Sequence, residues 1–358
     1  MKKIVTIVGA RPQFVKAAVV SRALSNEGLD EVIVHTGQHF DPNMSALFFE
    51  EMEIPEPKYN LEISNLTHGA MTGRMLESIE EILIREKPEM VLVYGDTNST
   101  LAGALAASKL NIRVGHIEAG LRSFNNKMPE EINRIITDRI SSILFCPTLT
   151  AIENLQREGF ANFDCQLINS GDVMQDAAMF YSRSSDKNST VLEKLNLDQK
   201  PFVLVTIHRQ ENTNDPEKLN DIINALNQIS DDATVILPLH PRTRNIIAES
   251  GIKLRFKPID PVGYLDMIQL LKHCSIVLTD SGGVQKEAFF FQKHCITLRE
   301  ETEWTELVEH GYNVLVGSDS LKILKAYELM KSKFSDFARN LYGNGHASET
   351  IAKLLANL

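Results

Sequence analysis

The sequence predicts an α/β protein in which two doubly wound parallel sheets follow one another along the chain. Short apolar runs bounded by Gly, Asp or Pro alternate with helix-length stretches almost throughout, and this alternation is typical of parallel strands covered by helices. The scheme occurs twice, on either side of polar segments at 169–172 and 182–189. With 358 residues, the chain also exceeds what one core usually fills. We therefore expect two similar Rossmann-like domains that face a cleft, with a boundary near residue 170.

The individual elements follow from this periodicity. In the first half we expect strands at Ile4–Val8, Glu31–Thr36, Met90–Tyr94, Arg113–Ile117 and Ser142–Cys146, with helices at Val15–Ser25, Met71–Glu86 and Thr100–Leu110. In the second half we expect strands at Phe202–Thr206, Thr234–Pro238, Ser275–Thr279 and Cys295–Leu298, with helices at Pro216–Ile229, Gly263–Leu271 and Gly283–Phe291.

Composition excludes several classes of protein. The formal net charge of −10 argues against a nucleic-acid binder, which usually carries a basic field. No apolar run approaches the ~18 residues of a membrane span, so we expect no membrane partner. The four cysteines form no metal-binding spacing, and we expect them to be reduced thiols in a cytoplasmic protein.

Several cofactor and catalytic fingerprints are absent. The sequence has no Walker P-loop, no H-E-x-x-H and no G-x-S-x-G motif. Its G-x-G, at Gly343–Gly345, follows no expected strand, so it is not a dinucleotide site. We therefore expect no nicotinamide, metal or other cofactor.

Three segments at expected strand ends could bind an anion. Arg11 follows the first strand at the start of a helix, and His208 and Arg209 follow the strand that ends at Thr206. The small residues Ser281, Gly282 and Gly283 precede a helix, so their amides can approach a diphosphate, and Glu287 could accept ribose hydroxyls. The alternatives are a strand–helix turn, a surface loop and an N-cap.

Carboxylates at other strand ends predict acid/base chemistry. Asp96 and Glu118 each follow a strand, Arg122 lies just beyond, and Glu130 and Glu131 open a helix after Pro129. Each carboxylate has a structural alternative, since Asp96 could cap a helix and acidic residues are favoured in a first helical turn. Three such sites at the ends of one sheet resemble an acid/base set more than three caps.

These segments together resemble the non-hydrolysing UDP-N-acetylglucosamine 2-epimerases. The most specific matches are Gly-His-Ile-Glu-Ala-Gly-Leu-Arg at 115–122 and Asp-Ser-Gly-Gly-Val-Gln at 280–285. Supporting matches are Gly-Ala-Arg-Pro at 9–12, Gly-Gln-His at 37–39, Tyr-Gly-Asp-Thr at 94–97, Pro-Glu-Glu-Ile-Asn-Arg at 129–134 and His-Arg at 208–209.

The resemblance implies a GT-B-like pair of domains with the active site in the cleft between them. The N-terminal domain would span 1–170, with a final helix at about 346–358 returning to it, and the C-terminal domain would span 171–345. A homodimer is usual in the family. The implied reaction is reversible C2 epimerisation of a UDP-2-acetamido sugar, UDP-GlcNAc to UDP-ManNAc, by anti elimination of UDP and re-addition to a 2-acetamidoglucal, for bacterial surface polysaccharide synthesis.

The family's residue roles carry over to matching positions. Arg11, His208, Ser281, Gly282 and Gly283 would hold the diphosphate, and Glu287 the ribose. Lys16, Asp96, Glu118 and Glu130 would surround the sugar; Arg122, Glu131 and Arg209 would bind substrate. Gln38 and His39 match part of a second, allosteric nucleotide-sugar site, although the following residues depart from the usual pattern.

Two further departures concern the substrate. Gln13 and the segment Glu303–Glu306, Glu-Trp-Thr-Glu, replace the Glu and Glu-Arg-Pro-Glu of many members, and both resemble the branch that acts on UDP-2,3-diacetamido-2,3-dideoxy-glucuronic acid. The same chemistry on this uronate is therefore an alternative. A hydrolysing 2-epimerase, a GT-B glycosyltransferase and a non-catalytic nucleotide-sugar sensor are further alternatives.

Overall fold

The computed structural model describes residues 2–38, 54–197 and 200–358. These residues form two compact units. Unit 1 contains Met1–Phe180 and Asn340–Leu358, and unit 2 contains Tyr181–Arg339. The change from unit 1 to unit 2 falls within one helix, α7 (Val173–Asn188).

Unit 1 is built on a parallel seven-stranded sheet in the order β3-β2-β1-β4-β5-β6-β7. Its strands are β1 (Lys3–Val8), β2 (Asp30–His35), β3 (Tyr59–Asn60), β4 (Met90–Tyr94), β5 (Arg113–Ile117), β6 (Ile143–Cys146) and β7 (Gln166–Asn169). The central strands are apolar along their whole length, as β4 illustrates with five buried residues in succession. Such runs are expected where helices cover both faces of a parallel sheet.

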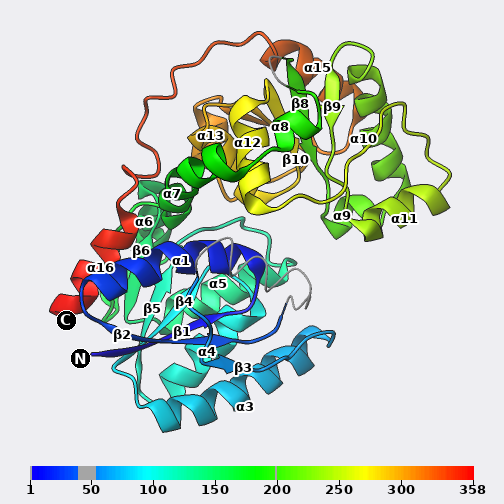
Figure 1. Cartoon of the computed structure of the whole chain (residues 1–358). Coiled ribbons are helices and arrows are strands. Elements are labelled where there is room, and N and C mark those ends of the chain that lie inside the picture. Colours follow the sequence, from blue (N-terminus) through cyan, green and yellow to red (C-terminus); the bar gives the residue numbers. More distant parts are fainter. Residues whose placement is uncertain (1, 39–53, 198–199) are drawn as a thin grey trace. The chain divides into compact units, whose positions relative to one another are not determined.

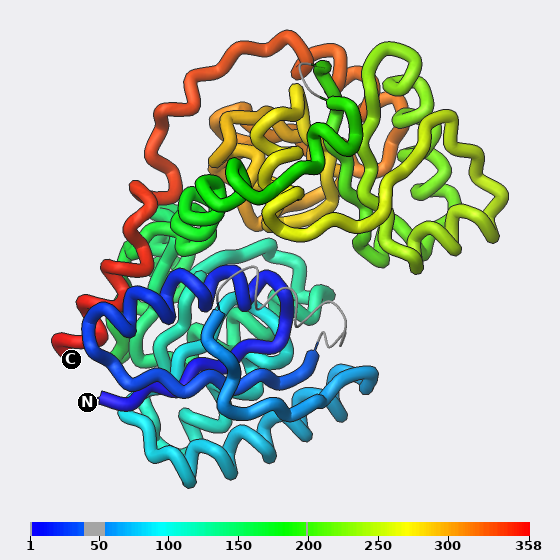
Figure 2. Tube along the Cα trace, viewed as in Figure 1, coloured from blue at the N-terminus to red at the C-terminus, as the bar shows by residue number. Residues whose placement is uncertain are grey.

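Helices cover both faces of this sheet (Figure 1). They are α1 (Arg11–Asn26), α3 (His68–Glu86), α4 (Asn98–Lys109), α5 (Pro129–Ile140), α6 (Leu149–Arg157), the short 3-10 helix η1 (Phe160–Asn162) and α16 (Ala347–Asn357). One core joins α3 and α4 to alternate residues of the strands, including Val5 and Ile7 of β1. The C-terminal helix α16 packs against α1, and the trace in Figure 2 shows the two side by side.

Unit 2 repeats the architecture with a parallel five-stranded sheet in the order β12-β11-β10-β8-β9. Its strands are β8 (Phe202–Thr206), β9 (Thr234–Ile236), β10 (Ile276–Thr279), β11 (Cys295–Thr297) and β12 (Asn313–Leu315). Its helices are α8 (Val191–Lys194), α9 (Gln210–Thr213), α10 (Pro216–Ile229), α11 (Pro241–Glu249), α12 (Tyr264–His273), α13 (Gly282–Phe290), α14 (Thr305–Glu309) and α15 (Ser320–Met330).

The two cores of unit 2 show why each strand is apolar on both faces. Val203 and Val205 of β8 face the core that contains α10 and α15. Phe202 and Leu204 of the same strand face the core that contains α12 and α13. The predicted α/β class, with two successive parallel sheets, is therefore confirmed.

The strand order places a topological switch point in each sheet. In unit 1 the chain leaves β1 toward β2 and later returns to β4 on the other side of β1. In unit 2 the corresponding neighbours are β8 and β10. Ligands of doubly wound sheets bind beyond the carboxyl ends of the strands at such points. The loops after β1, β4, β8 and β10 are therefore the expected ligand-binding segments.

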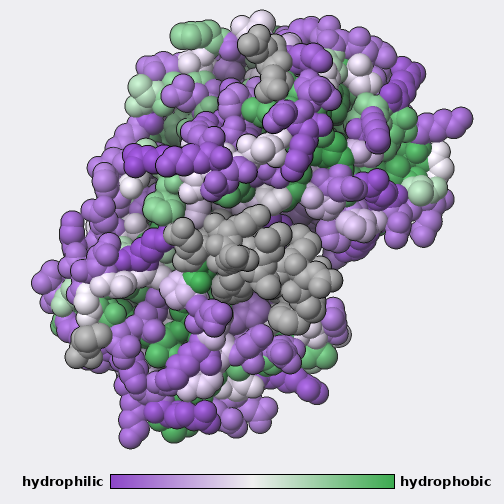
Figure 3. All heavy atoms as spheres, viewed as in Figure 1, coloured by the Kyte–Doolittle hydropathy of each residue, from purple (hydrophilic) through white to green (hydrophobic). Residues whose placement is uncertain are grey.

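The surface that Figure 3 shows is largely hydrophilic, with scattered hydrophobic residues. The large apolar side chains that are most exposed, such as Phe334 at 94 % and Leu321 at 78 %, belong to unit 2. Among the described residues, no helix has both the length and the apolar character that crossing a bilayer requires.

Candidate functional site

Polar residues gather beyond the carboxyl ends of three adjacent strands in unit 1. Arg11 is the first residue of α1 after β1, Asp96 follows β4, and Glu118 directly follows β5. Helix α1 begins earlier than predicted, at Arg11, because Pro12 has no N–H to lose in a first helical turn and its fixed φ suits that turn. Arg11 therefore lies at the positive end of the helix.

Lys16 and Glu118 form an ion pair at this edge. Lys16 projects from the second turn of α1, and its Nζ contacts Oε2 of Glu118. Their side chains are only 10 % and 9 % exposed, so the pair is largely shielded from solvent. Removing either partner would leave a poorly hydrated charge without its counter-ion, which would lower the stability of the fold.

The backbone at this edge is strained. Glu118 has φ +71°, a conformation that a residue with a Cβ rarely adopts. Gly95 has φ +63°, and a Cβ added there would lie 3.0 Å from Oε2 of Glu118 and 3.7 Å from Nζ of Lys16. The ion pair thus packs directly against Gly95, where a side chain would be both strained and crowded. Strain of this kind persists where the surrounding structure holds it, often at functional sites.

Asp96 is held by α5. Its carboxylate pairs with Arg134, and its backbone carbonyl accepts a hydrogen bond of 2.9 Å from Nδ2 of Asn133. The helix cap is Thr97, whose side chain accepts from the amide of Thr100 at 3.2 Å. The capping alternative for Asp96 is therefore wrong, and its carboxylate, 32 % exposed, remains accessible at the strand end.

Arg122 lies in the interior, where it can touch no ligand. It is 2 % exposed, and its guanidinium pairs with Asp138 at 2.7 Å and with Glu158 at 2.7 Å. Asp138 also accepts a 2.7 Å hydrogen bond from Nδ1 of His116. Burial alone would raise the pKa of Asp138, but His116 and Arg122 hold it below its ordinary value. The expectation that Arg122 binds substrate does not fit this enclosure.

Glu131 and Glu130 have different surroundings although they are adjacent. Glu131 is 1 % exposed, accepts backbone hydrogen bonds from Ser123 and Phe124, and pairs with Arg134 at 2.8 Å. It therefore fixes the 123–124 turn and Arg134, and direct substrate binding does not fit. Glu130 is exposed in the first turn of α5, on the same helix face as Arg134 four residues later.

Gln38 is tied to the start of α4. Its Oε1 accepts from the amide of Ser99 at 3.1 Å and from the Ser99 hydroxyl at 2.8 Å. His39, its expected partner in a second ligand site, lies outside the described residues. The allosteric site thus stays a prediction.

In unit 2, the start of α13 presents the expected small residues. Ser281 caps the helix, and its Oγ accepts from the amide of Val284 at 3.4 Å. Gly282 and Gly283 form the first turn and are partly exposed. A Cβ on Gly282 would meet Oε1 of Glu303 at 2.4 Å, so a larger residue there would displace the Glu303 side chain. The capping alternative is correct for Ser281, and the amides of the helix start still face outward for an anion.

His208 and Asp280 link the two strand ends at the switch point of unit 2. Nδ1 of His208 lies 3.0 Å from Oδ1 of Asp280, and the amides of His208 and Arg209 donate to the same carboxylate at 3.1 and 3.0 Å. Asp280 is fully buried; burial would raise its pKa, but His208 and its other hydrogen-bond donors hold the pKa below its ordinary value. Because a carboxylate only accepts, Nδ1 of His208 carries the proton and Nε2 is left for a ligand. The His208 side chain is 56 % exposed.

The two remaining expected residues of unit 2 are differently placed. Arg209 precedes α9 and is half-buried. Glu287 is 4 % exposed, and its Oε1 accepts a 3.0 Å hydrogen bond from the Tyr264 hydroxyl. Burial and the nearby Glu287 raise the pKa of Tyr264, so this hydroxyl stays a donor.

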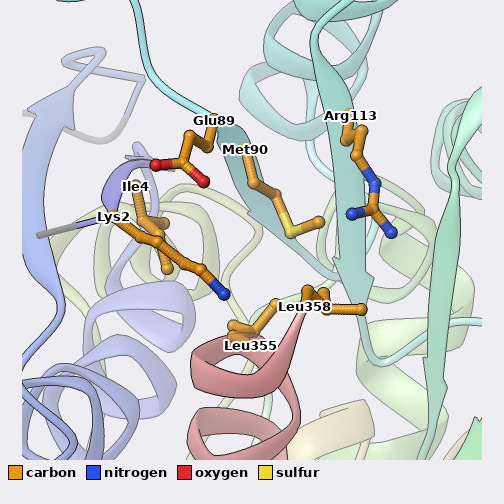
Figure 4. Close-up of a pocket in the computed structure, with 7 residues that line it drawn as sticks. All are labelled: Lys2, Ile4, Glu89, Met90, Arg113, Leu355 and Leu358. Atoms are coloured by element: carbon orange, nitrogen blue, oxygen red, sulfur yellow. The ribbon is translucent and has the colours of Figure 1, made fainter.

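A pocket in unit 1 lies away from these residues. Figure 4 shows it between the amino ends of the strands and the end of α16, lined by Lys2, Ile4, Glu89, Met90, Arg113, Leu355 and Leu358. It lies at the opposite edge of the sheet from Asp96 and Glu118. Within residues 2–38, 54–197 and 200–358, no group of three or more His, Cys, Asp or Glu residues could hold a metal ion.

Comparison with known proteins identifies close relatives. The family model for UDP-N-acetylglucosamine 2-epimerase matches residues 22–356. UDP-2,3-diacetamido-2,3-dideoxy-D-glucuronate 2-epimerase of Pseudomonas aeruginosa is 56 % identical, over 99 % of this chain and 100 % of that protein. UDP-N-acetylglucosamine 2-epimerase of Methanocaldococcus jannaschii is 44 % identical, over 99 % and 98 % of the two chains.

Solved structures agree with these matches. The M. jannaschii UDP-GlcNAc 2-epimerase in complex with UDP-GlcNAc and UDP has a TM-score of 0.92 at 43 % identity, with all of both chains covered. The Neisseria meningitidis UDP-GlcNAc 2-epimerase bound to UDP-GlcNAc has a TM-score of 0.88 at 31 % identity, over 99 % of this chain and 100 % of that one.

Proposed function

Because the chain belongs to the UDP-N-acetylglucosamine 2-epimerase family, we propose that it reversibly inverts C2 of a UDP-linked 2-acetamido sugar. The observation that carries this proposal is the arrangement in unit 1. Two carboxylates, Asp96 and Glu118, follow adjacent parallel strands, and each pairs with a cation, Arg134 and Lys16.

The chemistry explains why such a set is needed. The C2 hydrogen of the sugar is not acidic, since no ring carbonyl lies next to it. When the C1–O bond breaks, UDP leaves with the electron pair and C1 gains oxocarbenium character. A carboxylate then takes the C2 proton, and the C–H electrons form the C1=C2 bond of a 2-acetamidoglucal. Return of a proton to the opposite face of C2 and of UDP to C1 gives the epimer.

Delivery to opposite faces requires more than one acid/base group. We assign the two proton transfers to Asp96 and Glu118. Lys16 orients the Glu118 carboxylate through their ion pair. Glu130, on the α5 face that also carries Arg134, completes the set as a third carboxylate near the sugar.

The leaving diphosphate needs fixed donors. We propose that the amides of Ser281, Gly282 and Gly283 and the imidazole Nε2 of His208 supply them in unit 2. Arg11 and Arg209 add guanidinium groups, and Glu287 accepts the ribose hydroxyls. Arg122 and Glu131 take positioning roles instead of binding roles, because both are enclosed and paired.

Two substrates fit this chemistry. The first is UDP-GlcNAc, which the M. jannaschii relative holds in its crystal structure. The second is UDP-2,3-diacetamido-2,3-dideoxy-glucuronic acid, which the 56 % identity to the P. aeruginosa enzyme favours. The proposal also includes three further properties: a homodimer, a cytoplasmic location, and a second nucleotide-sugar site at Gln38 and His39.

The proposed function is tested by incubating the protein with each UDP-sugar and following the anomeric and C2 signals by NMR. The proposal expects conversion of one of them to the C2 epimer with UDP still attached, and the same equilibrium from either side. Free sugar released together with UDP would favour the hydrolysing alternative. Transfer of the sugar to an acceptor with unchanged C2 would favour a glycosyltransferase.

A further inference from the structure

His116 and Asp138 form a buried pair beneath the acid/base residues of unit 1. Both side chains are 0 % exposed. His116 lies in β5, two residues before Glu118, and Asp138 lies in α5. Neither residue can reach a bound sugar, so neither belongs to the catalytic set proposed above.

The hydrogen bonds fix the protons of the imidazole. Nε2 of His116 lies 2.7 Å from the carbonyl oxygen of Gly95, which can only accept, so Nε2 donates. Nδ1 lies 2.7 Å from Asp138. Asp138 also accepts from Arg122 at 2.7 Å and from the amide of Gly120 at 3.2 Å, as an ionised carboxylate does. Both ring nitrogens therefore donate, and the ring is an imidazolium.

The pair holds both backbone segments that carry the acid/base groups. His116 fixes the Gly95 carbonyl, one residue before Asp96, while the Gly95 amide donates to Ile117 at 2.9 Å. Asp138 fixes the Gly120 amide, two residues after Glu118. The Glu118 carboxylate in turn packs against Gly95, at 3.0 Å from where a Cβ would stand.

We propose that His116, doubly protonated and braced by Asp138, is a positioning residue that sets the separation of the Asp96 and Glu118 carboxylates. A buried ion pair is often no more stabilising than apolar residues of the same volume, so stability alone does not explain why charged groups occupy this position. The use of the pair is to hold a turn with φ +63° at Gly95 and a strained Glu118 in register. Since proton transfer needs near-contact geometry, displacement of about 1 Å costs about 10²-fold in rate.

The test compares H116L, which removes both donors, with H116Q, whose amide can still donate to Gly95. The matched control is E158Q, because Glu158 contacts the outer side of Arg122 and lies 35 % exposed, away from Gly95. We expect kcat to fall about 10²-fold in H116L and less in H116Q. UDP affinity should stay within about 2-fold of wild type, because none of the proposed UDP-binding residues contacts His116 in the bonds described above. E158Q should keep kcat within about 3-fold.

Two results would overturn the inference. One is a folded H116L with the kcat of E158Q; the other is a loss of kcat matched by an equal loss of UDP affinity, which indicates general damage. Because H116L can fail to fold, the ¹⁵N signals of the wild-type ring are measured as well, and a ring nitrogen without a proton at neutral pH also overturns it. The inference rests on the proposed epimerase activity: an inactive wild type refutes that activity, whereas an active wild type with an equally active H116L refutes only the role of His116.

Discussion

Replacing Gly95 by alanine tests whether the packing of Glu118 and Lys16 against this residue matters for turnover. The added Cβ is unfavourable for two reasons. Alanine at φ +63° adopts the left-handed conformation, which costs about 1–2 kcal/mol. The methyl also lies 3.0 Å from Oε2 of Glu118, closer than side chains usually tolerate, so the carboxylate must shift.

The structure supplies a matched control for the first penalty. Gly28, in the turn after α1, has φ +70° and has nothing within 4 Å of the position of its Cβ. Gly28→Ala therefore has the same backbone cost of about 1–2 kcal/mol without any steric contact. Both variants should lose a few degrees in Tm, because about 1 kcal/mol shifts Tm by roughly 2–4 °C for domains of 150–250 residues.

Turnover should separate the two variants. We expect kcat to fall at least about 10-fold in G95A, since a shift of 1 Å can cost about 10²-fold, and to stay unchanged in G28A. The assay is epimerisation followed by NMR, with thermal unfolding of both proteins measured in parallel. Equal kcat values in G95A and G28A would refute the claim that the Glu118–Lys16 pair must rest on a bare Gly95.

Two further substitutions probe the two units separately. Glu118→Gln should lower kcat by at least about 10²-fold, the usual loss of an acid/base group, without weakening UDP binding; near-normal turnover would contradict its assignment. Asp280→Asn should weaken UDP binding in a titration, because the new amide keeps only one accepting oxygen and its NH2 group faces donors such as His208 Nδ1 and the Arg209 amide. The Tm difference between the wild type and this variant should depend on pH. Asp280 has a folded pKa below its ordinary value of 3.8, so its stabilisation is present above about pH 4 and is lost as the pH falls through the folded pKa. The Tm gap between wild type and D280N should therefore close in acid, and a gap that is constant down to pH 2 would contradict this reasoning.

The fold was largely predictable because its signal is local. Continuous apolar runs such as Met90–Tyr94 and Phe202–Thr206 match the observed strands to the residue. The three strands that were not predicted are short or half-exposed: β3 has two residues, β7 has a polar first residue and exposed ends, and β12 has three residues. Edge strands of this kind have too little apolar periodicity to be recognised.

The sequence predicts which types of residue form the candidate site, but it does not predict which side chains pair with one another. Asp96 and Glu118 follow strands as the sequence predicts, yet nothing local in the sequence shows that Arg134 holds Asp96 from another helix. Arg122 and Glu131 are charged residues near predicted strand and helix ends, where binding residues are expected. Only the tertiary structure shows that their ion-pair partners enclose them.

Gln13 illustrates the same limit. Its amide is 2 % exposed; Oε1 accepts from the amides of Gly9 and Ala10, and Nε2 donates to the carbonyl of Tyr94. It therefore fixes the loop after β1 from the interior of unit 1, an arrangement that the sequence alone does not reveal.

The central claim is that departure of UDP from C1 makes the neighbouring C2 proton removable. Incubation of the wild-type protein in D₂O with each UDP-sugar, followed by NMR of C2, tests it most directly. We predict that deuterium enters at C2 of one nucleotide sugar in both epimers, before any free sugar accumulates. Epimerisation that retains the original hydrogen at C2, or the absence of exchange with both sugars, would contradict it.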